Sequence, residues 1–138
     1  MKEKILAEKA PEPIGLYPHA RRAGNLLFLS GIGPREAGTN KIPGNLYTKK
    51  GKLKKYDIEA QCHSVFKNVK TVLEAAGSKW ENLIDVTIFL INMKDDFPVM
   101  NKLYAEYFKD NQPCRTTVEI KSLPTPIVIE LKCIATVE

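Results

Sequence analysis

The segment Pro113–Glu138, PCRTTVEIKSLPTPIVIELKCIATVE, constrains the fold more than any other part of the sequence. Its two halves are rich in β-branched residues, and a polar stretch with two prolines separates them, which predicts two strands joined by a turn. Each predicted strand carries one charged residue of interest, Arg115 in the first and Glu130 in the second. We expect these strands to pair as a hairpin, with Arg115 opposite Ile134 and Glu130 opposite Glu119.

Both charged residues have a chemical and a purely structural interpretation. Apolar neighbours on both sides of Glu130 indicate a strand that is buried on at least one face. A carboxylate there costs free energy unless it is paired, hydrogen-bonded or used in chemistry. The planar guanidinium of Arg115 fits a substrate carboxylate in a bidentate way. The alternative is that the two charges neutralise each other or face water.

Composition and cysteine usage indicate a cytoplasmic globular protein. With 138 residues and 43% hydrophobic content, we expect a loose N-terminal arm over residues 1–13 and one domain over residues 14–138. No run of ~18 apolar residues predicts a membrane helix, so no membrane partner is expected. The three cysteines have no paired spacing and are predicted to be free thiols. No Cys/His cluster has the spacing of a metal site, so no metal is expected.

The net charge of +5 is concentrated in a lysine-rich stretch over residues 49–55, which contains five lysines. Such a stretch either contacts nucleic acid or forms a solvated loop. No aromatic residues interleave with these lysines, as base stacking would require. The composition therefore favours the solvated loop, and a nucleic-acid partner is not expected.

The remaining chain predicts a β-β-(β)-α-β-α-β-β order. The predicted elements are strands at 20–23 and 26–30, a short strand near 46–48, a helix between Asp57 and Gly77, a strand at 83–91, a helix capped by Asp95 or Asp96 with Pro98 in its first turn, and the two final strands. Two helices of similar length can cover one face of a mostly antiparallel sheet. The other face is left open, which predicts oligomerisation.

Several motifs resemble those of a known family. They are GLYPHA, LFLSG, TIFLINMKDDF, PCRTTVEI and IVIELKCIA, and they extend over residues 14–137. In this order they resemble the reactive intermediate deaminases, the Rid or YjgF-type proteins. The resemblance implies a chorismate-mutase-like α+β fold, with two helices on one face of a mixed, mostly antiparallel sheet. It also implies a homotrimer with ligand clefts between subunits, and no metal or organic cofactor.

The same resemblance implies an activity and a set of site residues. The activity is hydrolysis of enamines and imines to a keto acid and ammonia. The family's carboxylate-binding arginine falls on Arg115, and its glutamate that acts through water falls on Glu130. The cleft tyrosine and the serine–glycine pair fall on Tyr17, Ser30 and Gly31.

Three local features resemble one branch of the family, the 2-aminomuconate deaminases. They are Pro18-His19, the Leu123-Pro124-Thr125-Pro126 sequence and the long connection after Gly31. A dicarboxylic substrate needs a second binding group. His19 is one candidate, with an exposed loop histidine as its alternative. The other candidates, each of which is otherwise a surface charge, are Arg21, Arg22 and Arg35.

Other functions remain open from the sequence. They are a general 2-aminoacrylate-type imine deaminase, a non-catalytic sensor of keto acids, and an RNA-binding protein or ribonuclease. A sensor needs only the arginine, so the presence of both Arg115 and Glu130 favours catalysis.

Overall fold

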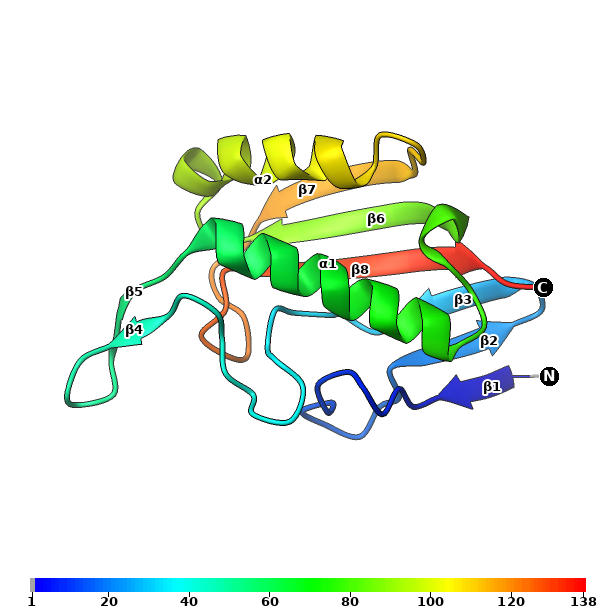
Figure 1. Cartoon of the computed structure of the whole chain (residues 1–138), viewed down its shortest axis with the longest axis horizontal. Coiled ribbons are helices and arrows are strands. Elements are labelled where there is room, and N and C mark those ends of the chain that lie inside the picture. The colour runs from blue at the N-terminus through cyan, green and yellow to red at the C-terminus, as the bar shows by residue number, and fades with distance from the viewer. Residues whose placement is uncertain (1) are drawn as a thin grey trace.

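The structure is a computed structural model that describes residues 2–138, and its main element is a six-stranded sheet with two long helices (Figure 1). The strand order is β1-β2-β3-β8-β6-β7, and every neighbouring pair is antiparallel except β6 and β7, which are parallel. The elements are β1 (Lys2–Ile5), β2 (Ala20–Ala23), β3 (Leu26–Leu29), β4 (Leu46–Tyr47), β5 (Leu53–Lys55), α1 (Ile58–Ala75), the short 3₁₀ helix η1 (Trp80–Asn82), β6 (Leu83–Leu90), α2 (Met93–Tyr107), β7 (Cys114–Glu119) and β8 (Ile129–Thr136).

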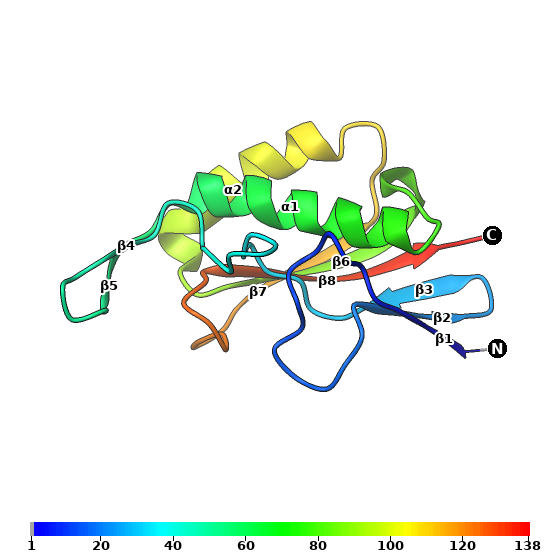
Figure 2. The same ribbon diagram turned by 60° about the horizontal axis from the view of Figure 1, so that its bottom comes forward.

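Both helices lie on the same face of the sheet, and the opposite face is not covered by a helix (Figure 2). The core fills the space between these two layers, and β8 shows why. Ile129, Leu131, Cys133 and Ala135 are buried against the helices, whereas the residues between them are half-buried on the other face. The α+β fold predicted from the sequence is therefore confirmed.

The ends of α1 follow from its sequence. Asp57 caps the first turn, because its Oδ1 accepts a hydrogen bond from the Ala60 N–H at 3.1 Å. At the other end Gly77 has φ +79°, and the Ser78 N–H donates to the Leu73 carbonyl at 2.9 Å. This is the left-handed cap that the glycine predicted.

The start of α2 differs from the prediction. The cap is Asn92, whose side chain accepts a hydrogen bond from the Asp95 N–H at 3.2 Å, rather than Asp95 or Asp96. The helix begins at Met93, so Pro98 lies inside it and not in its first turn. Asn92 follows directly after the end of β6 and Ile91, which makes it the first side chain able to cap the chain as it turns.

The predicted hairpin between the last two strands is wrong. Strand β6 lies between β7 and β8, parallel to the first and antiparallel to the second. Arg115 is aligned with Val86, and Glu130 is aligned with Phe89. Because β6 is one of the most apolar strands, it is more stable in the centre of the sheet, where both of its edges are paired.

The loose arm expected over residues 1–13 is also not observed. Lys2–Ile5 forms β1, which pairs with β2 at one edge of the sheet. Ala7 and Ala10 are buried in the core. The segment was predicted to be loose because it is charged, but its few apolar residues are enough to anchor it.

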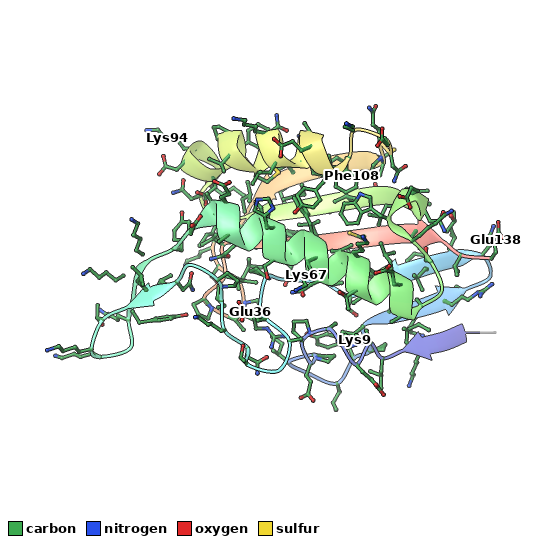
Figure 3. All side chains as sticks on the ribbon, in the orientation of Figure 1. Lys9, Glu36, Lys67, Lys94, Phe108 and Glu138 are labelled. Atoms are coloured by element: carbon green, nitrogen blue, oxygen red, sulfur yellow. The ribbon has the colours of Figure 1, made fainter. Side chains whose placement is uncertain are left out.

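The lysine-rich stretch forms a hairpin of β4 and β5 that projects from one end of the molecule (Figure 1). All five of its lysines are exposed. Long side chains of this hairpin extend away from the rest of the protein (Figure 3). This exposure agrees with the solvated-loop interpretation of residues 49–55.

Candidate functional site

Glu130 lies on the face of the sheet that the helices leave open. It is half-buried between Ile129 and Leu131, whose side chains point to the opposite face. None of the described residues forms a hydrogen bond or an ion pair with its carboxylate. Burial raises the pKa of the Glu130 carboxyl above its ordinary value. The group is thus an unpaired carboxylate whose proton affinity is increased.

A β-bulge at Ser30–Gly31 faces this carboxylate. Phe28 pairs with Ile134 and Ile32 bridges to Leu131, so four steps along one strand oppose three along the other. A Cβ placed on Gly31 would lie 2.7 Å from Glu130 Oε2. Only glycine leaves room for the carboxylate in this position.

Several hydrogen bonds hold the bulge in place. Ser30 donates from its hydroxyl to the Pro18 carbonyl at 2.7 Å and from its N–H to the His19 carbonyl at 2.9 Å. Within residues 2–138, no acceptor is found for the Gly31 N–H. The backbone therefore presents one free donor next to Glu130, where a ligand oxygen can accept it.

Lys132 is a residue of this region that the sequence analysis missed. It lies two positions after Glu130, on the same face of β8, and its ammonium donates to the Leu29 carbonyl at the start of the bulge. Burial lowers the pKa of the Lys132 ammonium. A lysine that alternates with buried residues in an apolar strand was the available signal, because it had to share the face of Glu130.

Tyr17 and His19 lie in the connection between β1 and β2. Tyr17 is exposed, and its hydroxyl accepts a hydrogen bond from the Ile14 N–H at 3.3 Å. His19 is buried: Nδ1 accepts from the Ala7 N–H at 2.9 Å, and Nε2 donates to the Pro11 carbonyl at 2.7 Å. The alternative of an exposed loop histidine is therefore wrong, and both ring nitrogens bind the N-terminal segment while His19 lines a cavity together with Tyr17, Ser30 and Gly31.

Arg115 lies on β7, at the other edge of the sheet, and points towards the helix layer. Its Nη1 donates to Asn101 Oδ1 at 2.9 Å. Its guanidinium carbon lies 4.7 Å from the centre of the Tyr104 ring and 5.8 Å from that of Phe97. No carboxylate among the described residues pairs with it. The aromatic rings fix the fork, and its charge remains available for an anion.

Arg115 and Glu130 do not meet within one chain. Arg115 shares its row of the sheet with Val86 and Cys133, whereas Glu130 shares its row with Phe89 and Val118. The two Cα atoms are therefore separated by three residues along the strands and by two strand spacings, or about 14 Å. Their side chains also point to opposite faces, since Val86 is buried under the helices.

The three arginines that were candidates for binding a second carboxylate have different surroundings in the structure. Arg21 is exposed on β2. Arg22 donates to the carbonyl of Gly24 at 2.9 Å and to a backbone oxygen of Glu138 at 3.2 Å. Arg35 lines a cavity of about 40 Å³ together with Tyr17, Ser30 and Gly31. The cavity thus brings together Arg35 and four of the predicted substrate-binding residues, Tyr17, His19, Ser30 and Gly31.

The three cysteines are free thiols, as their spacing predicted. Cys62, Cys114 and Cys133 are free, and only Cys114 is exposed. Cys62 is buried while the adjacent His63 is exposed, so they are not a nucleophile–base pair. In the described part of the chain, no three His, Cys, Asp or Glu side chains are grouped as metal ligands. No helix there is long and apolar enough to cross a membrane.

Known proteins match the chain over nearly its full length. The family described as Endoribonuclease L-PSP matches residues 7–137. A RutC family protein of Pyrococcus horikoshii is 43% identical over 135 residues, which cover 98% of each chain. Reactive Intermediate Deaminase A, chloroplastic, of Arabidopsis thaliana is 36% identical over 98% of this chain and 66% of its own length. The crystal structure of the E. coli YjgF gene product matches with a TM-score of 0.83 and 31% identity, over 97% of this chain and 98% of that one. The structure of E. coli TdcF with bound serine matches with a TM-score of 0.84 and 27% identity, over 99% of each chain.

Proposed function

The protein belongs to the Endoribonuclease L-PSP family, which includes the RutC and YjgF relatives, and we propose that it is a hydrolytic enamine/imine deaminase. Two relatives support this proposal. The Arabidopsis thaliana protein is named a reactive intermediate deaminase, and the E. coli TdcF structure contains serine, a small carboxylate-bearing amine. With its three free thiols, the chain suits a reducing compartment such as the cytosol.

The observation that carries the proposal is the position of the Glu130 carboxylate next to Gly31. An unpaired, half-buried carboxylate with a raised pKa lies against a glycine whose N–H is free among the described residues. A general base works best when its pKa is close to the operating pH, so burial suits Glu130 to this role. The free N–H supplies a fixed donor for a substrate heteroatom or a water.

The reaction uses water as its only co-substrate. The enamine first tautomerises, as carbon gains a proton and nitrogen loses one, and the resulting imine has an electrophilic carbon. Glu130 then removes a proton from water as its oxygen adds to the C=N carbon, and the nitrogen gains a proton. Glu130 then transfers the hydroxyl proton of this carbinolamine to the nitrogen as the C–N bond breaks, ammonia leaves and the C=O bond of the keto acid forms. Arg115 holds the adjacent carboxylate and orients the reacting carbon.

The site needs two copies of the chain, because Arg115 and Glu130 point to opposite faces of one sheet. A homotrimer supplies a second copy with closed symmetry, as the family resemblance implies. The open face is suited to bury against a neighbour, since it carries Phe28, Phe89 and Ile134 in addition to its charged groups. Arg115 of one chain then acts with Glu130 and Gly31 of the next.

The finer assignment is 2-aminomuconate as substrate. It rests on Pro18-His19 and on residues 123–126, together with the long connection after Gly31. The general alternative is 2-aminoacrylate, a monocarboxylate. The two differ in the second carboxylate, which only 2-aminomuconate presents to the protein.

Ammonia release from freshly generated 2-aminomuconate and 2-aminoacrylate tests the function. We expect acceleration of both reactions above the spontaneous rate, with a larger kcat/KM for 2-aminomuconate. Equal kcat/KM values, or a larger value for 2-aminoacrylate, would contradict 2-aminomuconate as the preferred substrate. The proposed deaminase activity would still hold. No acceleration with either substrate, combined with saturable binding of keto acids, would identify a sensor instead.

A further inference from the structure

The cavity beside the Ser30–Gly31 bulge has the size and charge of a binding site for a small anionic group. It has a volume of about 40 Å³ and is lined by Pro13, Tyr17, Ser30, Gly31 and Arg35, among other residues. A single water needs roughly 10–15 Å³ on this measure, so the cavity accepts a few heavy atoms rather than a whole substrate. A carboxylate is a group of this size.

Among the described residues that line the cavity, only Arg35 has a permanent charge. Its Nη1 donates to Asn40 Oδ1 at 2.9 Å, and its Nη2 donates to the Glu12 carbonyl at 2.8 Å. Both acceptors are neutral, and no described carboxylate pairs with the guanidinium. An arginine has five N–H donors, so three remain for a ligand. The two bonds hold the fork in place without neutralising its charge.

The cavity and the proposed reaction centre share one residue, Gly31. Gly31 lines the cavity and Glu130 does not, and a Cβ added to Gly31 would lie 2.7 Å from Glu130 Oε2, so the Gly31 backbone lies between the cavity and the carboxylate. A substrate whose reacting carbon is placed by Glu130 can reach the cavity only with a group several bonds away. A second carboxylate at the far end of an unsaturated chain meets this requirement.

We propose that this cavity is an anion subsite in which Arg35 binds the second carboxylate of a dicarboxylic enamine or imine. The proposal rests on the deaminase function proposed above and assigns its substrate class. Arg21 and Arg22 are not part of the subsite, since neither lines the cavity. Arg22 in particular is already bound to backbone oxygens of Gly24 and Glu138.

The test compares Arg35→Gln with wild type in two measurements. The first is kcat/KM for 2-aminomuconate and for 2-aminoacrylate. The second is the binding affinity, by calorimetry, for a dicarboxylic keto acid, 2-oxoadipate, and a monocarboxylic one, 2-oxobutyrate. Loss of a charge-assisted hydrogen bond weakens binding by about 10- to 100-fold. We expect the ratio of dicarboxylate to monocarboxylate values to fall by that factor in both measurements.

Two control variants separate charge from loop structure. Arg22→Gln removes an arginine outside the cavity and is expected to leave both ratios unchanged. Asn40→Gly removes the acceptor of Arg35 Nη1 but keeps the guanidinium, and glycine tolerates the φ of +59° at this position. It is expected to keep most of the preference for dicarboxylates.

Unchanged ratios in Arg35→Gln, or equal losses for both classes of ligand, would overturn the subsite. Failure of the proposed function has a different signature. In that case the wild type deaminates neither substrate, and the keto-acid affinities still decide whether Arg35 selects a second carboxylate.

Discussion

The two faces of the sheet hold the two charged groups of the proposed site in different ways. On the covered face Arg115 lies against Tyr104 and Phe97 and donates to Asn101, so it is fully positioned within its own chain. On the open face Glu130 has no hydrogen-bond or ion-pair partner among the described residues and lies beside the bulge at Gly31. Arg115 is therefore positioned by residues of its own chain, whereas the Glu130 carboxylate is free to bind a substrate, a water or a group of a second chain.

The largest expected effect comes from the covered face. Arg115→Ala should lower kcat/KM by about 10³-fold, because two charge-assisted hydrogen bonds to the substrate carboxylate are lost. Arg115→Lys should also lose most of the activity, since an ammonium has no planar fork. Ammonia release measures both variants, with Lys102→Ala as a control for removal of an exposed charge from α2. Near wild-type rates in Arg115→Ala would show that this face contributes no anchor.

Glu130→Gln should lower turnover by about 10²-fold while keto acids still bind, because the amide keeps the shape but cannot act as a base. The pH profile sharpens this expectation. Burial raises the pKa of Glu130, so the acidic limb of kcat/KM should lie above the ordinary range of a glutamate. The limb should disappear in Glu130→Gln. A limb that persists unchanged would assign the base to another group.

Ionisation of the Glu130 carboxyl should lower the stability of the folded protein. A pKa that is raised in the folded state means that the ionised form opposes folding, so stability is lost as pH rises through the raised pKa. Glu130→Gln should therefore have a higher Tm than wild type at neutral pH, and the difference should vanish below the ordinary pKa of glutamate. A lower Tm at neutral pH would mean that the carboxylate has a stabilising partner.

The bulge offers a smaller and more local test with a matched pair of glycines. Gly31→Ala would place a Cβ 2.7 Å from Glu130 Oε2, so the carboxylate must move and activity should fall by about 10-fold or more. Gly33 lines the same cavity as Gly31, but Gly33→Ala would place a Cβ 2.8 Å from Ile127 Cδ1, the flexible end of a side chain, and not beside the carboxylate, so this variant controls for the loss of a cavity-lining glycine. If both variants lose activity equally, the contact between Gly31 and Glu130 has no special role.

The smallest effect is expected from two buried hydroxyls of the covered face, Tyr104 and Thr117, which have no hydrogen-bond partner within the described chain. Burial raises the pKa of Tyr104 to about 12, which agrees with a poorly solvated hydroxyl. Tyr104→Phe and Thr117→Val should leave the free energy of unfolding unchanged or raise it by up to about 1 kcal/mol. Urea unfolding measures the change. A clear loss of stability would mean that these hydroxyls have partners.

The sequence was most informative where a local rule decides the structure. Asp57 and Gly77 bounded α1 because a cap depends on a few neighbouring residues. The alternation around Glu130 correctly indicated a strand buried on one face. The family motifs supported the fold, because they follow one another in the same order along the chain.

It was least informative where the outcome depends on distant contacts. The hairpin of the last two strands was wrong because β6 competes for the central position, and sequence spacing does not measure that competition. The burial of His19 was not predicted because its partners, Ala7 and Pro11, lie in a segment that was predicted to be loose. The proposal of Arg35 rather than Arg21 as the second anchor depends on the cavity, which the sequence does not reveal.

The most direct test of a site shared between two chains is subunit mixing. Arg115→Ala and Glu130→Ala proteins are unfolded together and refolded, and mass spectrometry verifies that mixed trimers have formed. If the two residues come from different chains, about a quarter of the sites receive both intact residues, and about a quarter of the wild-type activity should return. If both come from one chain, every site lacks one of them. Mixed trimers without activity would contradict the shared site.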